Sequence, residues 1–97
     1  MAEDALIHQS TRLRIMAALC GLAAGEPIEF ARLRSIVEAT DGNLGAHIET
    51  LAKAGYVEVE KRFIDRRPQT RLAATASGRQ AFLGHVAWLR ALLAGTA

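Results

Sequence analysis

Short polar side chains at helical spacing, followed by a group of arginines, are the residues of this chain that can do the most chemistry. Asn43 and His47 lie one helical turn apart, and Thr50 lies almost one turn further on. An asparagine amide can form two hydrogen bonds with adenine, and a histidine N–H can donate to a base or to a phosphate. Because the major groove of B-DNA admits an α-helix, this spacing favours contact with duplex DNA. The alternative for Asn43 is a helix-start residue that satisfies its own backbone.

Five basic side chains lie in the segment after this helix, which has the pattern of a β-hairpin. Arg66 and Arg67 fall in the predicted turn, where they can enter a minor groove or hold phosphates. Lys61, Arg62 and Arg71 fall on the flanking strands and can support them through the DNA backbone. The alternative is a solvated hairpin whose charges only keep an edge strand from aggregating.

Charge is divided unevenly along the chain. Residues 1–60 carry five basic and nine acidic side chains, a net charge of −4, whereas residues 61–97 carry seven basic and one acidic side chain, a net charge of +6. The formal net charge of +2 therefore hides a basic C-terminal part, where we expect a polyanionic partner to bind.

The helix that carries the polar side chains is predicted from apolar spacing and end signals. Leu44, Ile48 and Leu51 share one face of it. Thr40 is its candidate N-cap, and Gly55 follows its last turn. The outward positions, which we expect to meet DNA, are Thr40, Asn43, Ala46, His47 and Thr50.

The other elements complete a small α+β domain. We predict a strand over 56–64, a turn over 65–69 and a return strand over 70–74, from alternating apolar residues and turn-forming residues. The remaining predicted elements are helices over 10–22 and about 31–39, a very short strand at 28–30, and a final helix from Thr75 or Ser77 to about Ala94. A helix followed at once by a basic hairpin is the layout of a winged helix.

Composition limits the class of protein. With 97 residues, of which 51% are hydrophobic, the chain is expected to fold as one domain over 1–97. The order of its elements makes the expected domain a mainly helical winged helix-turn-helix. No apolar run approaches the roughly 20 residues that a membrane helix needs, so we expect no membrane association. The acidic start is not followed by a signal-peptide pattern, so we expect a cytoplasmic protein. Cys20 stands alone and is expected to be a small buried hydrophobe.

The final helix is apolar on two sides. One stripe is formed by Phe82, Val86, Leu89 and Leu93, and a second by Leu83, Trp88, Leu92 and alanines. We expect one side to pack on the domain and the other on a second copy, which makes residues of about 75–94 a C-terminal dimerisation helix. The predicted interface comprises Phe82, Val86, Trp88, Leu89, Leu92 and Leu93. The alternative is that the N-terminal segment covers the second stripe within one chain.

The sequence has no pattern that predicts a catalytic site or a metal site. No phosphate-cradling glycine loop and no nucleophile–base pair occurs at a recognisable spacing, so we do not expect an enzyme. His8, His47 and His85 fall on separate elements without ligand spacing, so surface or capping roles are expected, with no metal and no cofactor.

Several segments, in the expected order, resemble one family. Residues 40–51 and 54–59 are similar to the recognition helix and first wing strand of bacterial winged-helix repressors of the MarR/ArsR type. Residues 66–72 resemble their wing tip and return strand, and 72–79 their entry into the last helix. Residues 10–16 resemble their first helix.

This resemblance implies a function. It implies a homodimer that binds an inverted-repeat operator in double-stranded DNA and regulates transcription, as a repressor. Relatives often bind a small-molecule effector between the dimer helices and the winged helix, so Trp88 or His85 can line such a cleft here. Many relatives carry Ser-Arg where this chain has Gly45-Ala46, so a winged-helix module that binds another protein is the alternative function.

Overall fold

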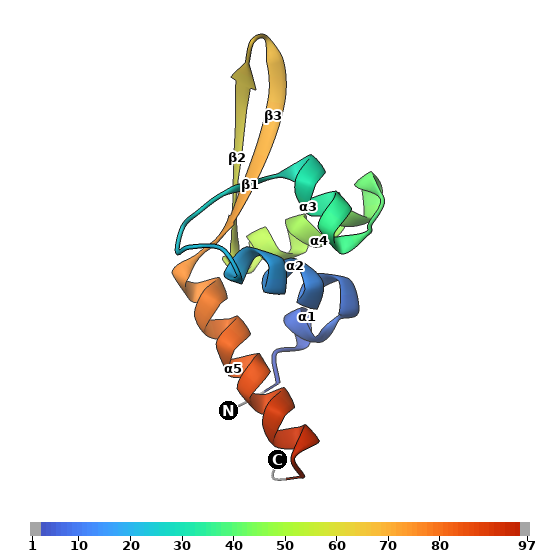
Figure 1. Cartoon of the computed structure of the whole chain (residues 1–97), viewed down its shortest axis with the longest axis vertical. Coiled ribbons are helices and arrows are strands. Elements are labelled where there is room, and N and C mark those ends of the chain that lie inside the picture. The colour runs from blue at the N-terminus through green and yellow to red at the C-terminus, as the bar shows by residue number, and fades with distance from the viewer. Residues whose placement is uncertain (1–2, 96–97) are drawn as a thin grey trace.

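The computed structural model describes residues 3–95 as a helical body from which two elements project. The elements are α1 (Ala5–His8), α2 (Ser10–Cys20), β1 (Ile28–Glu29), α3 (Phe30–Val37), α4 (Asp41–Lys53), β2 (Val57–Ile64), β3 (Arg67–Ala74) and α5 (Ala76–Leu93). In Figure 1, α1–α4 form the body, while the β2–β3 hairpin and α5 leave it in opposite directions. The expected α+β, mainly helical winged-helix class is confirmed. Among the described residues, no helix is long and apolar enough to cross a membrane.

Helix α4 forms where its end signals place it. The Thr40 hydroxyl accepts a hydrogen bond from the Asn43 N–H at 3.2 Å, which satisfies one of the free amides of the first turn. Helix α2 differs slightly from expectation. The side-chain oxygen of Gln9 accepts from the Arg12 N–H at 2.9 Å, so Gln9 is the N-cap and Ser10 is the first helical residue.

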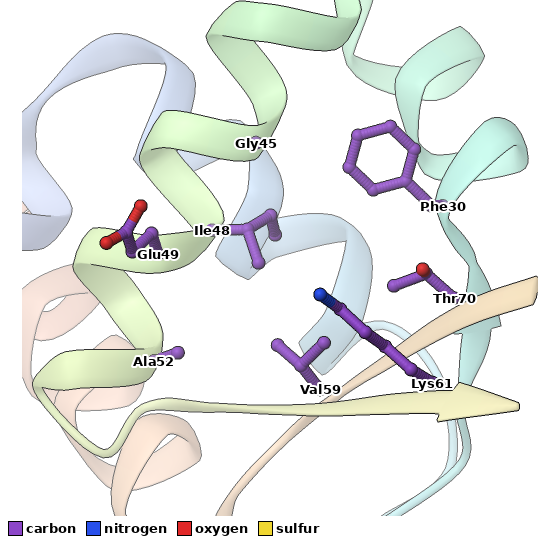
Figure 2. Close-up of a pocket in the computed structure, with 8 residues that line it drawn as sticks. All are labelled: Phe30, Gly45, Ile48, Glu49, Ala52, Val59, Lys61 and Thr70. Carbon is purple, nitrogen blue, oxygen red and sulfur yellow. The ribbon is translucent and has the colours of Figure 1, made fainter.

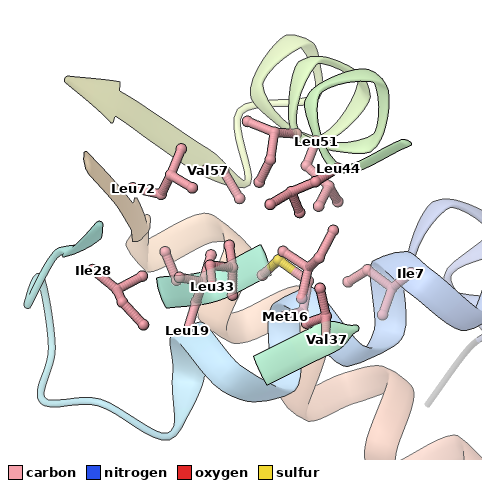
Figure 3. Close-up of a cluster of buried hydrophobic side chains, with 13 residues drawn as sticks. Ile7, Met16, Leu19, Ile28, Leu33, Val37, Leu44, Leu51, Val57 and Leu72 are labelled. Carbon is pink, nitrogen blue, oxygen red and sulfur yellow. The ribbon is translucent and has the colours of Figure 1, made fainter. Parts of the chain in front are cut away.

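The core fills the space between the helices and the base of the hairpin (Figure 3). Every element except α5 contributes to its buried apolar residues, and α5 adds Ala81 and Phe82 at its edge. The buried set is Ile7, Ile15, Met16, Leu19, Ile28, Leu33, Val37, Leu44, Ile48, Leu51, Val57, Leu72 and Ala74. Because three of these residues lie on α4, its opposite face is held in a defined direction.

The hairpin, which we call the wing, is part of a three-stranded antiparallel sheet in the order β1-β3-β2. Its ladder runs from Val57↔Ala74 to Ile64↔Arg67, and only Asp65 and Arg66 form the turn. These two residues have φ of 49° and 67°, the positive values that a tight two-residue hairpin turn requires. The predicted turn over 65–69 is therefore wrong, because residues 67–69 lie in β3.

Proline is typical of turns, and Pro68 favoured the longer predicted turn, but Pro68 occupies a position in the β2–β3 ladder. The pair that closes a two-residue turn exchanges hydrogen bonds, so the next pair, Phe63↔Pro68, does not. The nitrogen of Pro68 then faces away from β2, beyond the end of β1, which pairs only with Arg71 and Leu72. The missing N–H consequently costs no ladder hydrogen bond.

The N-terminal segment folds against α5 through two histidines. His85 is fully buried, and its Nδ1 accepts a hydrogen bond from the Asp4 N–H at 3.0 Å. Its Nε2 therefore carries the proton and donates to Nδ1 of His8 at 3.2 Å, while the Trp88 ring stacks on His85 at 5.4 Å. Burial, with a smaller effect from His8, lowers the pKa of His85 and favours this neutral form. The expected surface role of His85 is wrong, because α1 covers this side of α5, whereas His8 is exposed as expected.

Hydrogen bonds and a close backbone contact fix the start of α5 against the junction between α4 and β2. Thr75 caps α5 by accepting from the Gly78 N–H at 2.9 Å, and its hydroxyl donates to the Gly55 carbonyl at 2.6 Å. The Thr75 N–H also donates to the carbonyl of Tyr56 at 3.0 Å. A Cβ at Gly78 would overlap that same carbonyl, so this approach requires glycine.

Arg79 ties α5 to the end of α2. Its guanidinium donates to the carbonyls of Cys20, Leu22 and Ala23 at 3.2, 2.9 and 2.9 Å. Cys20 is the last residue of α2, and Leu22 and Ala23 lie in the turn after it, where the Ala23 carbonyl also accepts from the Glu26 N–H at 2.9 Å. Cys20 is half-buried beside this contact, and burial raises the pKa of its thiol.

A pair of glycine substitutions in α5 tests the lock at Gly78. Gly78→Ala should lower the free energy of unfolding by about 1–3 kcal/mol, because the added methyl forces α5 away from Tyr56. Gly84→Ala is the matched control, since a Cβ there meets no atom within 4 Å. It should raise the free energy of unfolding by about 0.5–1 kcal/mol through helix propensity. Urea unfolding followed by circular dichroism measures both, and equal effects would contradict the lock.

Candidate nucleic-acid interface

The outer face of α4 presents polar groups away from the core. Asn43 and Ala46 are exposed, whereas His47 and Thr50 are half-buried. Within residues 3–95 the Asn43 side-chain amide has no partner, and the Asn43 N–H donates to the Thr40 hydroxyl rather than to its own side chain. The Thr50 hydroxyl donates to the Ala46 carbonyl at 3.1 Å. Asn43 is therefore the side chain on this face whose hydrogen-bonding groups are most available.

His47 is held in one tautomer by an arginine that the sequence reasoning missed. Arg12 of α2 donates from Nε to the Leu6 carbonyl at 2.6 Å and from Nη1 to Nδ1 of His47 at 3.0 Å. An Nδ1 that accepts leaves the proton on Nε2. Burial, and then the charge of Arg12, lower the pKa of His47. At neutral pH His47 consequently offers an uncharged N–H donor, which suits a base acceptor better than a phosphate.

A groove separates α4 from the wing (Figure 2). Its volume is about 750 Å³, and it is lined by Phe30, Gly45, Ile48, Glu49, Ala52, Val59, Lys61 and Thr70. Figure 2 shows the Lys61 side chain reaching from β2 into this groove toward α4. Gly45 has no side chain to fill the groove from the helix side. The groove therefore has an apolar floor, a cation and the Thr70 hydroxyl on the wing, and Glu49 on the helix.

The register gives the wing two chemically different sides. Side chains directly opposite each other in an antiparallel ladder share a side, and successive residues alternate. The side toward α4, here the inner side, comprises Val57, Val59, Lys61, Phe63, Pro68, Thr70, Leu72 and Ala74. The outer side comprises Glu58, Glu60, Arg62, Ile64, Arg67, Gln69, Arg71 and Ala73. Lys61 is thus the single charged residue of the inner side.

Two of the predicted DNA-binding arginines form hydrogen bonds with neighbouring side chains on the outer side of the wing. Arg71 donates to Oε1 of Glu60 through Nε at 2.9 Å and lies 2.8 Å from it through Nη2. Arg62 donates through Nε to Oε1 of Gln69 at 2.8 Å. These pairs hold both guanidinium groups along the ladder, on the side away from Lys61. The structure therefore does not bring Arg62 and Arg71 together with Lys61.

The wing tip keeps its arginines available. Arg66 lies in the turn and Arg67 at the start of β3, and both are exposed. Across the described part of the chain, neither guanidinium has a hydrogen-bonding or ion-pairing partner. The tip thus carries two available positive charges at the end of a molecule whose longest dimension is 53 Å.

The predicted dimer residues fall into two groups on α5. Phe82 packs against the core of its own chain, and Trp88 lies against His8 and His85. Val86 and Leu89 are half-buried. Leu92 and Leu93 are 49% and 84% exposed, and Leu83, which was not in the predicted set, is 64% exposed. The N-terminal segment thus covers part of the second stripe, as the alternative anticipated, and Leu83, Leu92 and Leu93 are the exposed leucines of α5.

An α-helix with a free polar face, followed by a basic antiparallel hairpin, is the arrangement of winged-helix DNA-binding proteins. Residues 11–93 match the family model of the winged helix DNA-binding domain, and the chain belongs to this family.

One sequence relative and two solved structures are similar to this chain. An uncharacterised protein of Methanocaldococcus jannaschii is 36% identical over 81 residues, 84% of this chain and 85% of that protein. A transcriptional regulator homologue from Pyrococcus horikoshii OT3 has a TM-score of 0.83 and 28% identity, over 93% of this chain and 86% of that one. A MarR family regulator from Silicibacter pomeroyi DSS-3 shares the fold, with a TM-score of 0.62 and 19% identity over 86% and 55%. The expected winged-helix family is confirmed, its fold is shared with a MarR family regulator, and transcriptional regulators of this fold are not enzymes.

Replacing Arg12 tests the electrostatic control of His47. Arg12→Met should raise the pKa of His47, because it removes the neighbouring positive charge while burial still lowers that pKa. The pKa is measured by following the His47 ring protons through an NMR titration. Arg14→Met is the matched control, since Arg14 is exposed on the same helix and should leave His47 unchanged. A His47 pKa that does not move in Arg12→Met would mean that burial alone sets it.

Proposed function

We propose that the protein is a sequence-specific DNA-binding transcriptional regulator, a repressor that acts as a homodimer on an inverted-repeat operator. The observation that supports this proposal is that side chains without hydrogen-bonding partners lie both on α4 and at the tip of the wing. The unpaired amide of Asn43 lies on the outer face of α4, and the unpaired guanidiniums of Arg66 and Arg67 lie at the tip of the adjacent wing. A helix fits the major groove, and a cationic arm beside it fits the flanking backbone.

The two elements take different parts in binding. In the proposed complex Asn43 reads adenine through its amide, His47 donates from Nε2 to a base acceptor, and Ala46 touches a thymine methyl group. Thr40 and Thr50 lie at the edge of the same interface between α4 and the major groove. Lys61, Arg66 and Arg67 neutralise phosphates or enter the minor groove. Arg62 and Arg71 contribute less than the sequence suggested, because Gln69 and Glu60 occupy them.

Dimerisation through α5 supplies the operator symmetry. Leu83 and Leu93 are exposed on a helix that projects from the body, and a second copy packed about a two-fold axis would bury them. In a dimer of this kind the two α4 helices would lie about one DNA turn apart, roughly 34 Å. We therefore expect half-site centres about 10–11 base pairs apart, or a multiple of that spacing.

A protein-binding module is the second candidate, and the groove between α4 and the wing favours it. Phe30, Ile48 and Val59 give that groove an apolar floor, which could accept a side chain of another protein. The DNA-binding measurement below separates the two functions.

Salt-dependent binding of DNA should distinguish the helix from the wing. Asn43→Ala should cost about 1–3 kcal/mol on a selected operator and little on random DNA, because the amide reads a base. Arg66→Ala and Arg67→Ala should weaken binding to both duplexes and lower the salt slope by about one for each lost phosphate contact. Fluorescence anisotropy at several salt concentrations measures all of these quantities.

Arg90→Ala is the matched control for the loss of a charge, since Arg90 is exposed on α5, away from the wing. It should leave both affinities unchanged. If the unmodified protein binds neither duplex below about 10 µM at about 100 mM salt, far weaker than ordinary specific binding, the regulator proposal fails. The protein-binding module then takes its place.

Charge placed on α5 should separate the dimer. Leu89→Lys combined with Leu93→Lys should give folded monomers, because two ammonium groups would have to be buried against a second copy. Light scattering at micromolar concentration reports the mass. Ile36→Lys is the matched control, since Ile36 is 51% exposed on α3 and lies outside the proposed interface. A monomeric unmodified protein would contradict the dimer.

A further inference from the structure

The wing tip carries an apolar pair that phosphate binding does not explain. Phe63 is 77% exposed, although burying a phenylalanine side chain is worth about 1.5–3 kcal/mol. It lies directly opposite Pro68, which is also exposed. Side chains of a non-hydrogen-bonded pair lie closer together than those of a hydrogen-bonded pair, so the ring and the proline form one continuous apolar surface.

We propose that Phe63 and Pro68 form a wedge that enters the minor groove of the operator, partly unstacks one base step and bends the duplex. This inference rests on the proposed DNA-binding function and adds a contact that neither α4 nor the arginines provide. Phenylalanine and proline are among the side chains that minor-groove proteins insert between base pairs.

The order of groups along the inner side of the wing favours DNA as the occupant. From the body outward, the α4 face is followed by the groove with Lys61 and Thr70, then by Phe63 and Pro68. A duplex presents the same order of features, which is the major groove, a sugar–phosphate strand and the minor groove. With α4 in the major groove, the phosphate strand would cross near the Lys61 ammonium. Phe63, two residues or about 6.7 Å further along the strand, would then face the minor groove.

Charge complementarity favours the same occupant. Arg66 lies in the turn and Arg67 next to Pro68 on the outer side; both are exposed, and within residues 3–95 they have no partners. The ladder of the described wing has no inward-facing acid, because Glu58 and Glu60 both lie on the outer side and Asp65 lies in the turn. A narrow minor groove has an enhanced negative potential that attracts arginine, so the charges would hold the wedge at the groove.

The wedge would add sequence preference without hydrogen bonds to bases. Unstacking a step costs a few kcal/mol, and pyrimidine–purine steps such as TA and CA unstack most easily. We therefore expect a pyrimidine–purine step in the operator at the position that each wing contacts. This position lies outside the bases that α4 contacts.

The experiment places a fluorescent purine analogue, whose emission rises on unstacking, at successive positions in the operator flanks. Fluorophores on the two duplex ends report bending by energy transfer. The unmodified protein should raise the emission several-fold at one flank position in each half-site and shorten the end-to-end distance. Phe63→Ser should abolish both signals and weaken binding about tenfold, the scale of losing one aromatic–base stacking contact. Pro68→Ala should reduce both signals.

Ile64→Ser is the matched control, because Ile64 lies next to Phe63 but on the outer side of the wing. It should keep the emission rise and the bend. Phe63 is mostly exposed, so Phe63→Ser should keep the unmodified protein's thermal unfolding profile. Phe63→Leu, which keeps an apolar wedge, should retain part of both signals.

The outcomes separate this inference from the function on which it rests. Tight operator binding with no emission rise at any flank position overturns the wedge and leaves the regulator function standing. Signals that survive unchanged in Phe63→Ser also overturn the wedge alone. Absence of binding to every duplex overturns both proposals.

Discussion

The close approach of α5 to the carbonyl of Tyr56 is the constraint on which the arrangement of this molecule depends. Gly78 permits it, and Thr75 adds two hydrogen bonds to the same junction. That junction is where α4 ends and the wing begins. The direction of the proposed dimer helix is therefore set within a few ångströms of the elements proposed to meet DNA. Arg79 extends the same connection to α2, so α5, the wing and the helical body are joined through the first turn of one helix.

The wing separates its charges by side rather than by position along the chain. On the outer side Glu60 pairs with Arg71 and Gln69 accepts a hydrogen bond from Arg62, so the negative charge of Glu60 neutralises a group that already faces away from α4. Positive charge remains available at the tip and at Lys61. Exposed ion pairs of this kind contribute little stability, about 0–1 kcal/mol each, so their main effect is on where the field of the wing is strong.

Local signals were enough to predict α4 and its faces, because the Thr40 cap, the spacing of Leu44 and Ile48, and Gly55 act within one helix. They were not enough for the wing. A turn over 65–69 would pair Ile64 with Thr70 and place Arg71 on the side of Lys61, whereas the two-residue turn places it on the other side. The histidine contact was also out of reach, because His8 and His85 are separated by 77 positions and meet only after the chain has folded.

The left-handed turn at the wing tip has a dynamic consequence. Asp65 and Arg66 both occupy a conformation that costs a non-glycine residue roughly 1–2 kcal/mol, and no core residue lies near them to offset it. The last rungs of the ladder should accordingly open at a much lower free energy than the body, and their amides should exchange with solvent first. A glycine in place of Arg66 would remove part of this conformational cost, but it would also remove a guanidinium from the tip of the wing. A partner that binds the tip must order it, and the conformational entropy lost in doing so lowers the affinity. Binding and rigidity at this tip are therefore thermodynamically coupled.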